Sequence, residues 1–343
     1  MLTASVIDNI LATIPQRTIG VLGDLFLDRY LDLDASLTEP SIETGLDAYQ
    51  VVRVRSYPGA AGTVINNLVA LGVGRIVPIS MIGDDGEGHE LLQALRKMPS
   101  LDTTNLATCV ARRTPTYTKP MLQMSGEPAR ELNRLDIKNR HPLPAEVEMS
   151  ILRRLTEHWP GFDVLLVLDQ VSEPECGVIT TLVRERLADL AAHHPGKIVI
   201  VDSRERVGLF RNTWLKPNER ECERVVSKGA DLPATLREMT RLCNRPVFCT
   251  RGDKGTLVAE SSEKPVMEVP GYAVTGPIDT VGAGDSSSAA LACALASGAD
   301  LAAAAAFANL IASITIQQIG VTGVATPEQV RERWRAVLRE QPG

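Results

Sequence analysis

Hydrophobic and polar positions follow two different periods along this chain of 343 residues. Short apolar runs predict buried strands, and apolar residues that recur every three or four positions predict helices. The predicted strands cover 18–22, 76–82, 164–168, 198–202 and 246–250, and the predicted helices cover 5–14, 63–71, 146–158, 175–193, 219–226, 232–242, 301–317 and 328–340. Because strands and helices alternate, the sequence predicts an α/β fold: a doubly wound, mostly parallel sheet flanked by helices.

Two segments lack the helical period and interrupt this alternation. Residues from about 30 to 57 and from about 109 to 136 are polar and alternate like strands. We expect them to pair as a small β-lid within a single domain spanning 1–343, because no repeat or flexible linker divides the chain. Gly23 and Asp24 follow the first predicted strand, and we expect them to open a substrate-facing loop, since ligands bind beyond the carboxyl ends of such strands.

The most informative stretch is the sequence DTVGAGDSSSAALACALASG, residues 279–298. Gly282 and Gly284 permit a tight turn, and the Ala, Leu and Ser residues behind them favour a helix. A helix that begins there directs several N–H groups to one point and attracts phosphate. Asp285 in this cradle is either a helix cap or a general base for a hydroxyl that attacks phosphorus. The second interpretation predicts a kinase.

Composition and charge exclude several classes of partner. With 44% hydrophobic and 4% aromatic residues the chain is an ordinary globular protein. A net charge of −6, without a dense Lys/Arg cluster, argues against nucleic acid. We find no apolar run of the ~18 residues that a membrane span needs and no signal-peptide pattern, so we expect a cytoplasmic protein without a membrane partner. The six cysteines are scattered and indicate neither a disulfide framework nor a zinc site.

Four stretches occur in the order typical of one family. They are GDLFLDRY (23–30), PGAAGTVINNLVALG (58–72), the pair TPTYTK and LNRLD, and DTVGAGD (279–285). On these stretches the chain resembles the PfkB (ribokinase-like) carbohydrate kinases over almost its whole length, and within them the heptose 7-phosphate kinases. The resemblance implies a ribokinase-like fold, ATP and Mg²⁺ as cofactors, a small-molecule sugar or sugar phosphate as acceptor, and a homodimer formed through the lid.

The resemblance also implies roles on the acceptor side. Asp285 would be the catalytic base, and the amides of Val281, Gly282, Ala283 and Gly284 would form the anion hole. The sugar would be bound by Asp28, Gly59, Thr63 and Asp169. Lys119 and Arg134 are candidates for gripping a phosphate already on the acceptor, unless they are solvated lid charges.

On the nucleotide side, Asn218 and Glu221 form an NxxE pair that would orient Mg²⁺ through water. The same resemblance assigns Thr250, Gly252 and Gly255 to a loop near the nucleotide phosphates, Asn309 to the adenine, and Asp279 and Val281 to a monovalent cation such as K⁺.

Three departures from the family pattern bear on the substrate. Where the heptose kinases read PGGAAN, this chain has Ala60 for a glycine and Thr63 for the sugar-binding asparagine, and Gln170 replaces a tyrosine beside Asp169. We therefore expect intact catalytic machinery with altered sugar recognition. A ribokinase-like or fructose-phosphate-like specificity and a non-catalytic nucleotide- or sugar-binding regulatory module both stay open. A complete GxGxxG after a strand and a Walker A sequence are both lacking, which argues against a Rossmann oxidoreductase and a P-loop kinase.

Overall fold

The computed structural model of the chain describes residues 2–225 and 231–340. Its strands are β1 Thr18–Gly23, β2 Leu25–Pro40, β3 Asp47–Ala60, β4 Arg75–Gly83, β5 Leu106–Cys109, β6 Thr116–Gln123, β7 Arg130–Glu131, β8 Leu135–Ile137, β9 Val164–Asp169, β10 Ile198–Ser203, β11 Trp214–Leu215, β12 Val247–Thr250, β13 Thr256–Ala259 and β14 Met267–Val269. Its helices are α1 Ala4–Thr13, α2 Ala61–Leu71, α3 Gly86–Leu95, α4 Ala145–His158, α5 Thr181–His193, α6 Glu219–Cys222, α7 Leu232–Cys243, α8 Ala283–Ala296, α9 Leu301–Thr315 and α10 Pro327–Glu340. None of these helices is long and apolar enough to cross a membrane.

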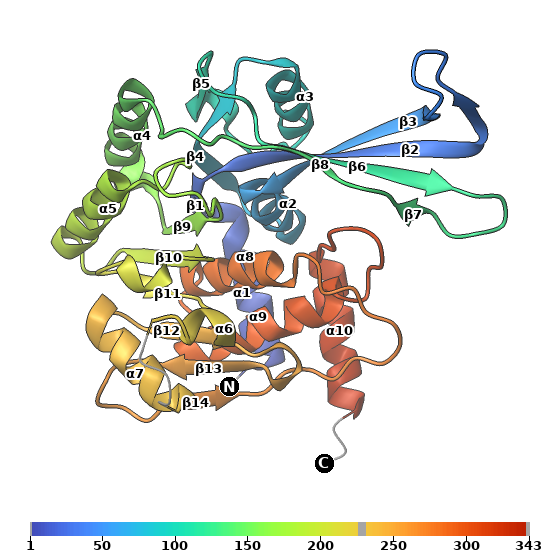
Figure 1. Cartoon of the computed structure of the whole chain (residues 1–343). Helices are drawn as coiled ribbons and strands as arrows, with labels where there is room; N and C mark the ends of the chain where they lie inside the picture. The colour runs from blue at the N-terminus through green and yellow to red at the C-terminus, as the bar shows by residue number, and fades with distance from the viewer. Residues whose placement is uncertain (1, 226–230, 341–343) are drawn as a thin grey trace.

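A large sheet forms the centre of the molecule (Figure 1), with strand order β14-β13-β12-β11-β10-β9-β1-β4-β5. The strands from β12 to β5 pair in parallel, and β13 and β14 add an antiparallel edge. The predicted doubly wound, mostly parallel sheet is therefore confirmed. The carboxyl ends of β9, β10 and β11 lie side by side, which is where such a sheet binds its ligands.

Helices cover both faces of this sheet, and β9 shows why. Every residue of β9 is buried, because successive side chains point to opposite faces and both faces are covered. Leu166 and Leu168 pack into a core shared with α1, α2, α8 and α9. Leu165 and Val167 pack into a second core shared with α4, α5 and α7. The continuous apolar run predicted as a buried strand thus serves two cores at once.

The lid projects from one side of the main domain as a second sheet, with order β3-β2-β6-β7 and with β8 paired to β6 (Figure 1). β2 pairs antiparallel with β3 and parallel with β6, so the predicted pairing of the two lid segments is confirmed. The expected loop after the first strand is wrong, however. β2 begins at Leu25, directly after β1, and Asp24 is buried where its carboxylate accepts the Val178 N–H at 3.0 Å.

Two helices are shorter than predicted. The helix expected over 175–193 begins only at Thr181, because Thr180 caps it by accepting the Val183 N–H, and Glu175 before it has a left-handed backbone with φ 60°. The helix expected from Glu219 ends at Cys222. Its predicted end, Val226, lies outside the described residues.

Ala60, one of the departures from the family pattern, keeps a backbone conformation that suits glycine. Its φ of 53° and ψ of −119° place the Cβ in a region that L-residues rarely adopt. We therefore expect Ala60→Gly to raise the free energy of unfolding by about 1 kcal/mol, because backbone strain of this kind outweighs the entropy that glycine adds to the unfolded chain. Urea unfolding measures the change. Ala61→Gly, at the first position of α2, is the control that should destabilise, and an unstabilised Ala60→Gly would contradict the strain.

Candidate active site

The glycine turn predicted from the sequence opens α8. Gly282 is the N-cap residue and has φ 80°, a left-handed conformation that glycine adopts without strain. A Cβ on Gly282 would come within 2.5 Å of the Thr322 side chain, so a larger residue has no room there. The turn therefore brings the start of α8 against the loop that contains Thr322.

Two of the predicted anion-binding amides remain available, and two do not. The Val281 N–H donates to the Asp279 carboxylate at 3.0 Å, and the Ala283 N–H donates to a carbonyl oxygen of the turn at 3.2 Å. Within the described residues, the N–H groups of Gly282 and Gly284 donate to no backbone carbonyl. The expected role of the Ala283 amide is therefore corrected: the turn uses it, and Gly282 and Gly284 are left to bind an anion.

Asp285 lies at a cavity of about 210 Å³, which we call the catalytic cavity. The cavity is lined by Gln170, Asp202, Arg204, Lys216, Asn218, Glu221, Thr250, Gly282, Gly284 and Asp285. Burial, followed by the negative charge of Asp202, raises the pKa of Asp285 to about 6, although the Gln170 amide donates to its Oδ1 at 3.2 Å and favours the ionised form. A carboxyl with this pKa is ionised at neutral pH and can still accept a proton, as a general base must.

Lys216 and Asp202 form an ion pair at the base of this cavity. The Lys216 Nζ lies 2.9 Å from Asp202 Oδ2, and Lys216 is only 4% exposed. Burial alone would lower the pKa of Lys216, but the nearby carboxylates of Asp202, Glu221 and Asp285 outweigh it and the pKa is raised. The site therefore contains a positively charged lysine in the same cavity as Asp285.

The nucleotide-side residues gather only in part. Asn218 and Glu221 form a capping box in which Asn218 Oδ1 accepts the Glu221 N–H at 3.0 Å and Glu221 Oε2 accepts the Asn218 N–H at 2.9 Å. Both residues line the catalytic cavity with Thr250. Burial raises the pKa of Glu221. No group of three or more His, Cys, Asp or Glu residues suited to a metal is found in 2–225 or 231–340.

Three other residues predicted near the nucleotide lie outside that cavity. Gly252 begins a short 3-10 helix, Gly252–Lys254, and Gly255 is its C-cap; both have positive φ. Asn309 uses its whole amide within the protein: Oδ1 accepts from Thr256 at 2.8 Å, and Nδ2 donates to the carbonyls of Val269 and Pro270, both at 3.1 Å. Asn309 therefore holds α9 against β13, and its position near the adenine stays a prediction.

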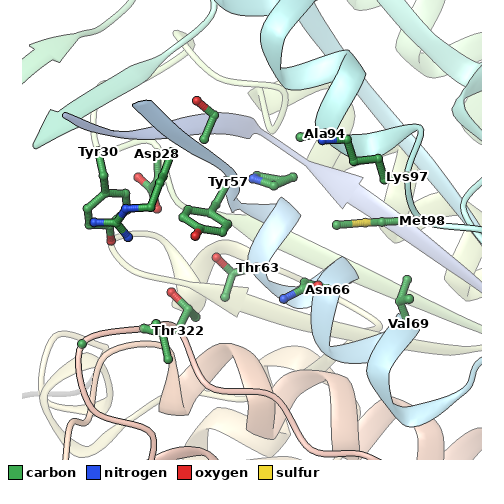
Figure 2. Close-up of a pocket in the computed structure, with 15 residues that line it drawn as sticks. Asp28, Tyr30, Tyr57, Thr63, Asn66, Val69, Ala94, Lys97, Met98 and Thr322 are labelled. Atoms are coloured by element: carbon green, nitrogen blue, oxygen red, sulfur yellow. The ribbon is translucent and has the colours of Figure 1, made fainter. Parts of the chain in front are cut away.

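The acceptor-side residues Asp28, Gly59 and Thr63 do come together. A Cβ on Gly59 would lie 2.8 Å from the Asp28 carboxylate, so the glycine lets the backbone approach that carboxylate closely. Asp28 and Thr63 line a second cavity, of about 480 Å³ (Figure 2). Burial raises the pKa of Asp28, although Lys119 Nζ lies 3.8 Å from its Oδ1.

The two basic residues proposed for an acceptor phosphate differ in their surroundings. Lys119 donates to the Tyr30 hydroxyl at 3.0 Å and lies over the Tyr30 ring. Arg134 pairs with Asp136 at 2.7 Å and lies over the Tyr117 ring. Arg134 lines a third cavity, of about 240 Å³, together with Arg204, which also lines the catalytic cavity.

Asp169 is held in the protein interior. It is 2% exposed, and its carboxylate accepts from Ser203 Oγ at 2.6 Å and from Arg206 Nε at 3.1 Å. The predicted contact of Asp169 with sugar is therefore corrected to an anchor between β9 and β10, and its neighbour Gln170 reaches the cavities instead. For the monovalent cation, the Asp279 carboxylate already accepts the N–H groups of Val281 and Gly320, both at 3.0 Å.

Sequence reasoning missed three residues that line the catalytic cavity: Asp202, Arg204 and Lys216. Each stands at or just beyond the end of a predicted strand, or in the LKPN sequence that precedes the NxxE pair. That position was the available signal, because the carboxyl ends of parallel strands share one edge of the sheet.

Comparisons with known proteins show which families the chain resembles. The model of the pfkB family carbohydrate kinases matches residues 186–329. The Bifunctional protein HldE of Pelobacter propionicus is 32% identical over 94% of this chain, and that of Caulobacter sp. is 33% identical over 94%. The chain spans only 64% and 65% of the length of these two relatives.

Solved structures show the same architecture. Arabidopsis thaliana ribokinase complexed with ribose and ATP matches with a TM-score of 0.65 and 17% identity, over 92% of this chain and 98% of that chain. Phosphofructokinase-2 from Escherichia coli in complex with substrates and products matches with a TM-score of 0.66 and 19% identity, over 94% of this chain and all (100%) of that chain. The fold is therefore ribokinase-like, and the chain is similar to the pfkB family carbohydrate kinases, whose model it matches over residues 186–329.

Proposed function

We propose that this chain transfers the γ-phosphoryl group of ATP to a hydroxyl of a sugar phosphate, and that a heptose 7-phosphate is its acceptor. The observation that carries the transfer is the single cavity that joins Asp285, the free amides of Gly282 and Gly284, and Lys216. The choice of a heptose 7-phosphate as acceptor rests on the sequence resemblance and is supported by the HldE relatives.

In the proposed reaction each residue of the cavity has one task. Asp285 accepts the proton of the attacking hydroxyl, while the Gly282 and Gly284 N–H groups and Lys216 offset the negative charge on the phosphoryl oxygens. Asn218 and Glu221 would hold Mg²⁺ through water, and that ion would neutralise charge on the ATP phosphates. Asp28 and Thr63 would hold the sugar hydroxyls.

We propose a reducing, cytoplasmic location for the protein, because the reaction needs ATP and because all six cysteines are free and buried.

The acceptor's own phosphate is assigned to Arg134 rather than Lys119. Arg134 lines a cavity that shares Gln170 and Arg204 with the catalytic cavity, so an anion there lies next to the reaction centre. Lys119, which contacts Tyr30 and Asp28, lines none of the three cavities described above. We propose that Lys119 orients Asp28 instead.

A panel of sugars and sugar phosphates, including heptose 7-phosphate, tests this function by coupled assay of ADP release with ATP and Mg²⁺. The largest kcat/KM is expected for heptose 7-phosphate. A maximum for another sugar would keep the kinase and replace the acceptor, and Thr63 is the reason to include ribose and fructose 6-phosphate. Tight ATP binding without turnover of any acceptor would instead support a regulatory module.

We further propose that the lid forms a homodimer. β3 is an edge strand of the lid, and Val52 and Val54 on one face of it are 56% and 54% exposed. Because an exposed apolar edge strand tends to pair with another chain, light scattering after gel filtration should give twice the monomer mass, and Val54→Asp should give a monomer. Leu209→Asp, an equally exposed leucine on the main domain, is the control that should stay dimeric. A monomeric wild type would refute the proposal.

A further inference from the structure

Gln170 is the first residue after β9, and its side chain lines two cavities at once. These are the catalytic cavity and the third cavity, of about 240 Å³, which Arg134 also lines. Gln170 is only 7% exposed, so close packing leaves its side chain few alternative positions. The Gln170 amide is therefore held between the general base and the proposed position of the acceptor's phosphate.

The partner of this amide fixes its orientation. Gln170 Nε2 donates to Asp285 Oδ1 at 3.2 Å. An ionised carboxylate can only accept hydrogen bonds, so the nitrogen of the amide, and not its oxygen, must face Asp285. The amide nitrogen has two N–H groups, and Asp285 accepts from only one of them. Within residues 2–225 and 231–340 the nitrogen donates to no other group, so its second N–H is available to a ligand of the two cavities.

The charges around the third cavity favour an anion. Lys138 and Glu173 in its lining lie 3.9 Å apart and offset each other, which leaves Arg134 and Arg204 against Asp24. Burial raises the pKa of Asp24 to about 7, so this carboxyl is partly protonated at neutral pH and contributes less negative charge. A phosphate in the cavity would therefore be attracted by the two guanidinium groups and could accept a hydrogen bond from the neutral amide beside them.

We propose that Gln170 is a positioning residue with two tasks, one for each of its N–H groups. One N–H holds Asp285 by Oδ1, so that Oδ2 is left to accept the proton of the attacking hydroxyl. The second N–H donates to the phosphate that the acceptor already carries. The inference rests on the proposed phosphoryl transfer, and it makes Gln170 a residue that selects phosphorylated acceptors.

The first task has a consequence for the titration of Asp285. The other charged groups that line the catalytic cavity are Asp202, Arg204, Lys216 and Glu221. Burial and Asp202 raise the pKa of Asp285, and the hydrogen bond from Gln170 is the largest of the effects that lower it, ahead of Lys216 and Arg204. Loss of the amide therefore raises the pKa of Asp285, so the carboxyl becomes protonated at a higher pH and the acid limb of kcat moves to higher pH.

Gln170→Met, which keeps the length of the side chain without its donors, tests both tasks in the full chain with ATP and Mg²⁺. The acid limb of kcat should move to higher pH by roughly half a unit to one unit, because the ionised base loses a hydrogen bond. With the best phosphorylated acceptor of the panel, kcat/KM should fall roughly threefold to tenfold more than with the same sugar without its phosphate. Gln170→Glu, which has the same shape, should also raise KM for the phosphorylated acceptor by ~10-fold or more through repulsion of its phosphate.

Two controls separate these tasks from a general effect on the fold. Gln93→Met makes the same exchange on an exposed glutamine of α3 that lines none of the three cavities, and it should keep the wild-type pH profile and acceptor preference. Circular dichroism melting identifies any variant that fails to fold.

The first task can also be measured without turnover. NMR titration of the aspartate carboxyl groups gives the pKa of Asp285 directly, with Asp285→Asn identifying its signal. An unchanged pKa of Asp285 in folded Gln170→Met would overturn the first task, and an unchanged preference for the phosphorylated acceptor would overturn the second. A wild type that turns over no acceptor of the panel would refute the phosphoryl transfer instead, while the NMR titration would still decide whether Gln170 holds Asp285.

Discussion

Asp285→Asn should lower kcat by on the order of 10² or more, because the variant keeps the shape of the side chain but cannot accept the hydroxyl proton. ATP binding should change little, since Gly282, Gly284 and Lys216 remain in the cavity. The pH profile provides a second readout. With a pKa of about 6, the wild-type carboxyl is protonated below that pH, so kcat should fall as the pH drops below about 6. The residual activity of the variant should lack this acid limb.

The control for Asp285→Asn is Asp300→Asn. Asp300 caps α9 by accepting the Ala303 N–H at 2.7 Å, and it does not line the catalytic cavity. Asparagine caps a helix about as well as aspartate, so this variant should keep wild-type kcat. Steady-state kinetics of both variants with the best acceptor of the panel decide the matter. Near-normal turnover of Asp285→Asn would mean that Asp285 serves only the start of the helix and is not the general base.

The catalytic turn could be predicted from the sequence because its cause is local. Gly282 and Gly284 are two residues apart, and the helix-forming run follows them directly. Asp285, the residue after Gly284, therefore lies in the first turn of the helix. The lid could be predicted from its alternating pattern, but its beginning could not. The β2 strand starts at Leu25 because it pairs with Ala60 of β3 and continues β1, and the sequence around Asp24 does not show that pairing.

The remaining cavity residues depend on strand register, which a single sequence does not show. Val201 of β10 pairs with Leu215 of β11 in parallel, so the next residues, Asp202 near the end of β10 and Lys216 just beyond β11, lie side by side. Nothing in the local sequence links the two. Strand register also explains why Asp169 is buried. Ser203 of β10 pairs with Asp169 of β9, and the Ser203 hydroxyl donates to the Asp169 carboxylate inside the protein.

Lys216→Met should destabilise the protein by about 3 kcal/mol, because it leaves the Asp202 carboxylate largely buried. Within residues 2–225 and 231–340 the Ser288 hydroxyl, at 2.8 Å, would be its one remaining side-chain hydrogen-bond partner. It should also move the acid limb of kcat to higher pH, since Lys216 is one of the charges that lower the pKa of Asp285 against the effect of Asp202. Urea unfolding and the pH profile measure the two effects. Lys216→Met/Asp202→Asn, which removes both charges, should regain part of the lost stability and shift the acid limb back, because the coupled pair is not additive. A Lys216→Met variant with wild-type stability and pH profile would mean that the ion pair supports neither the fold nor the general base.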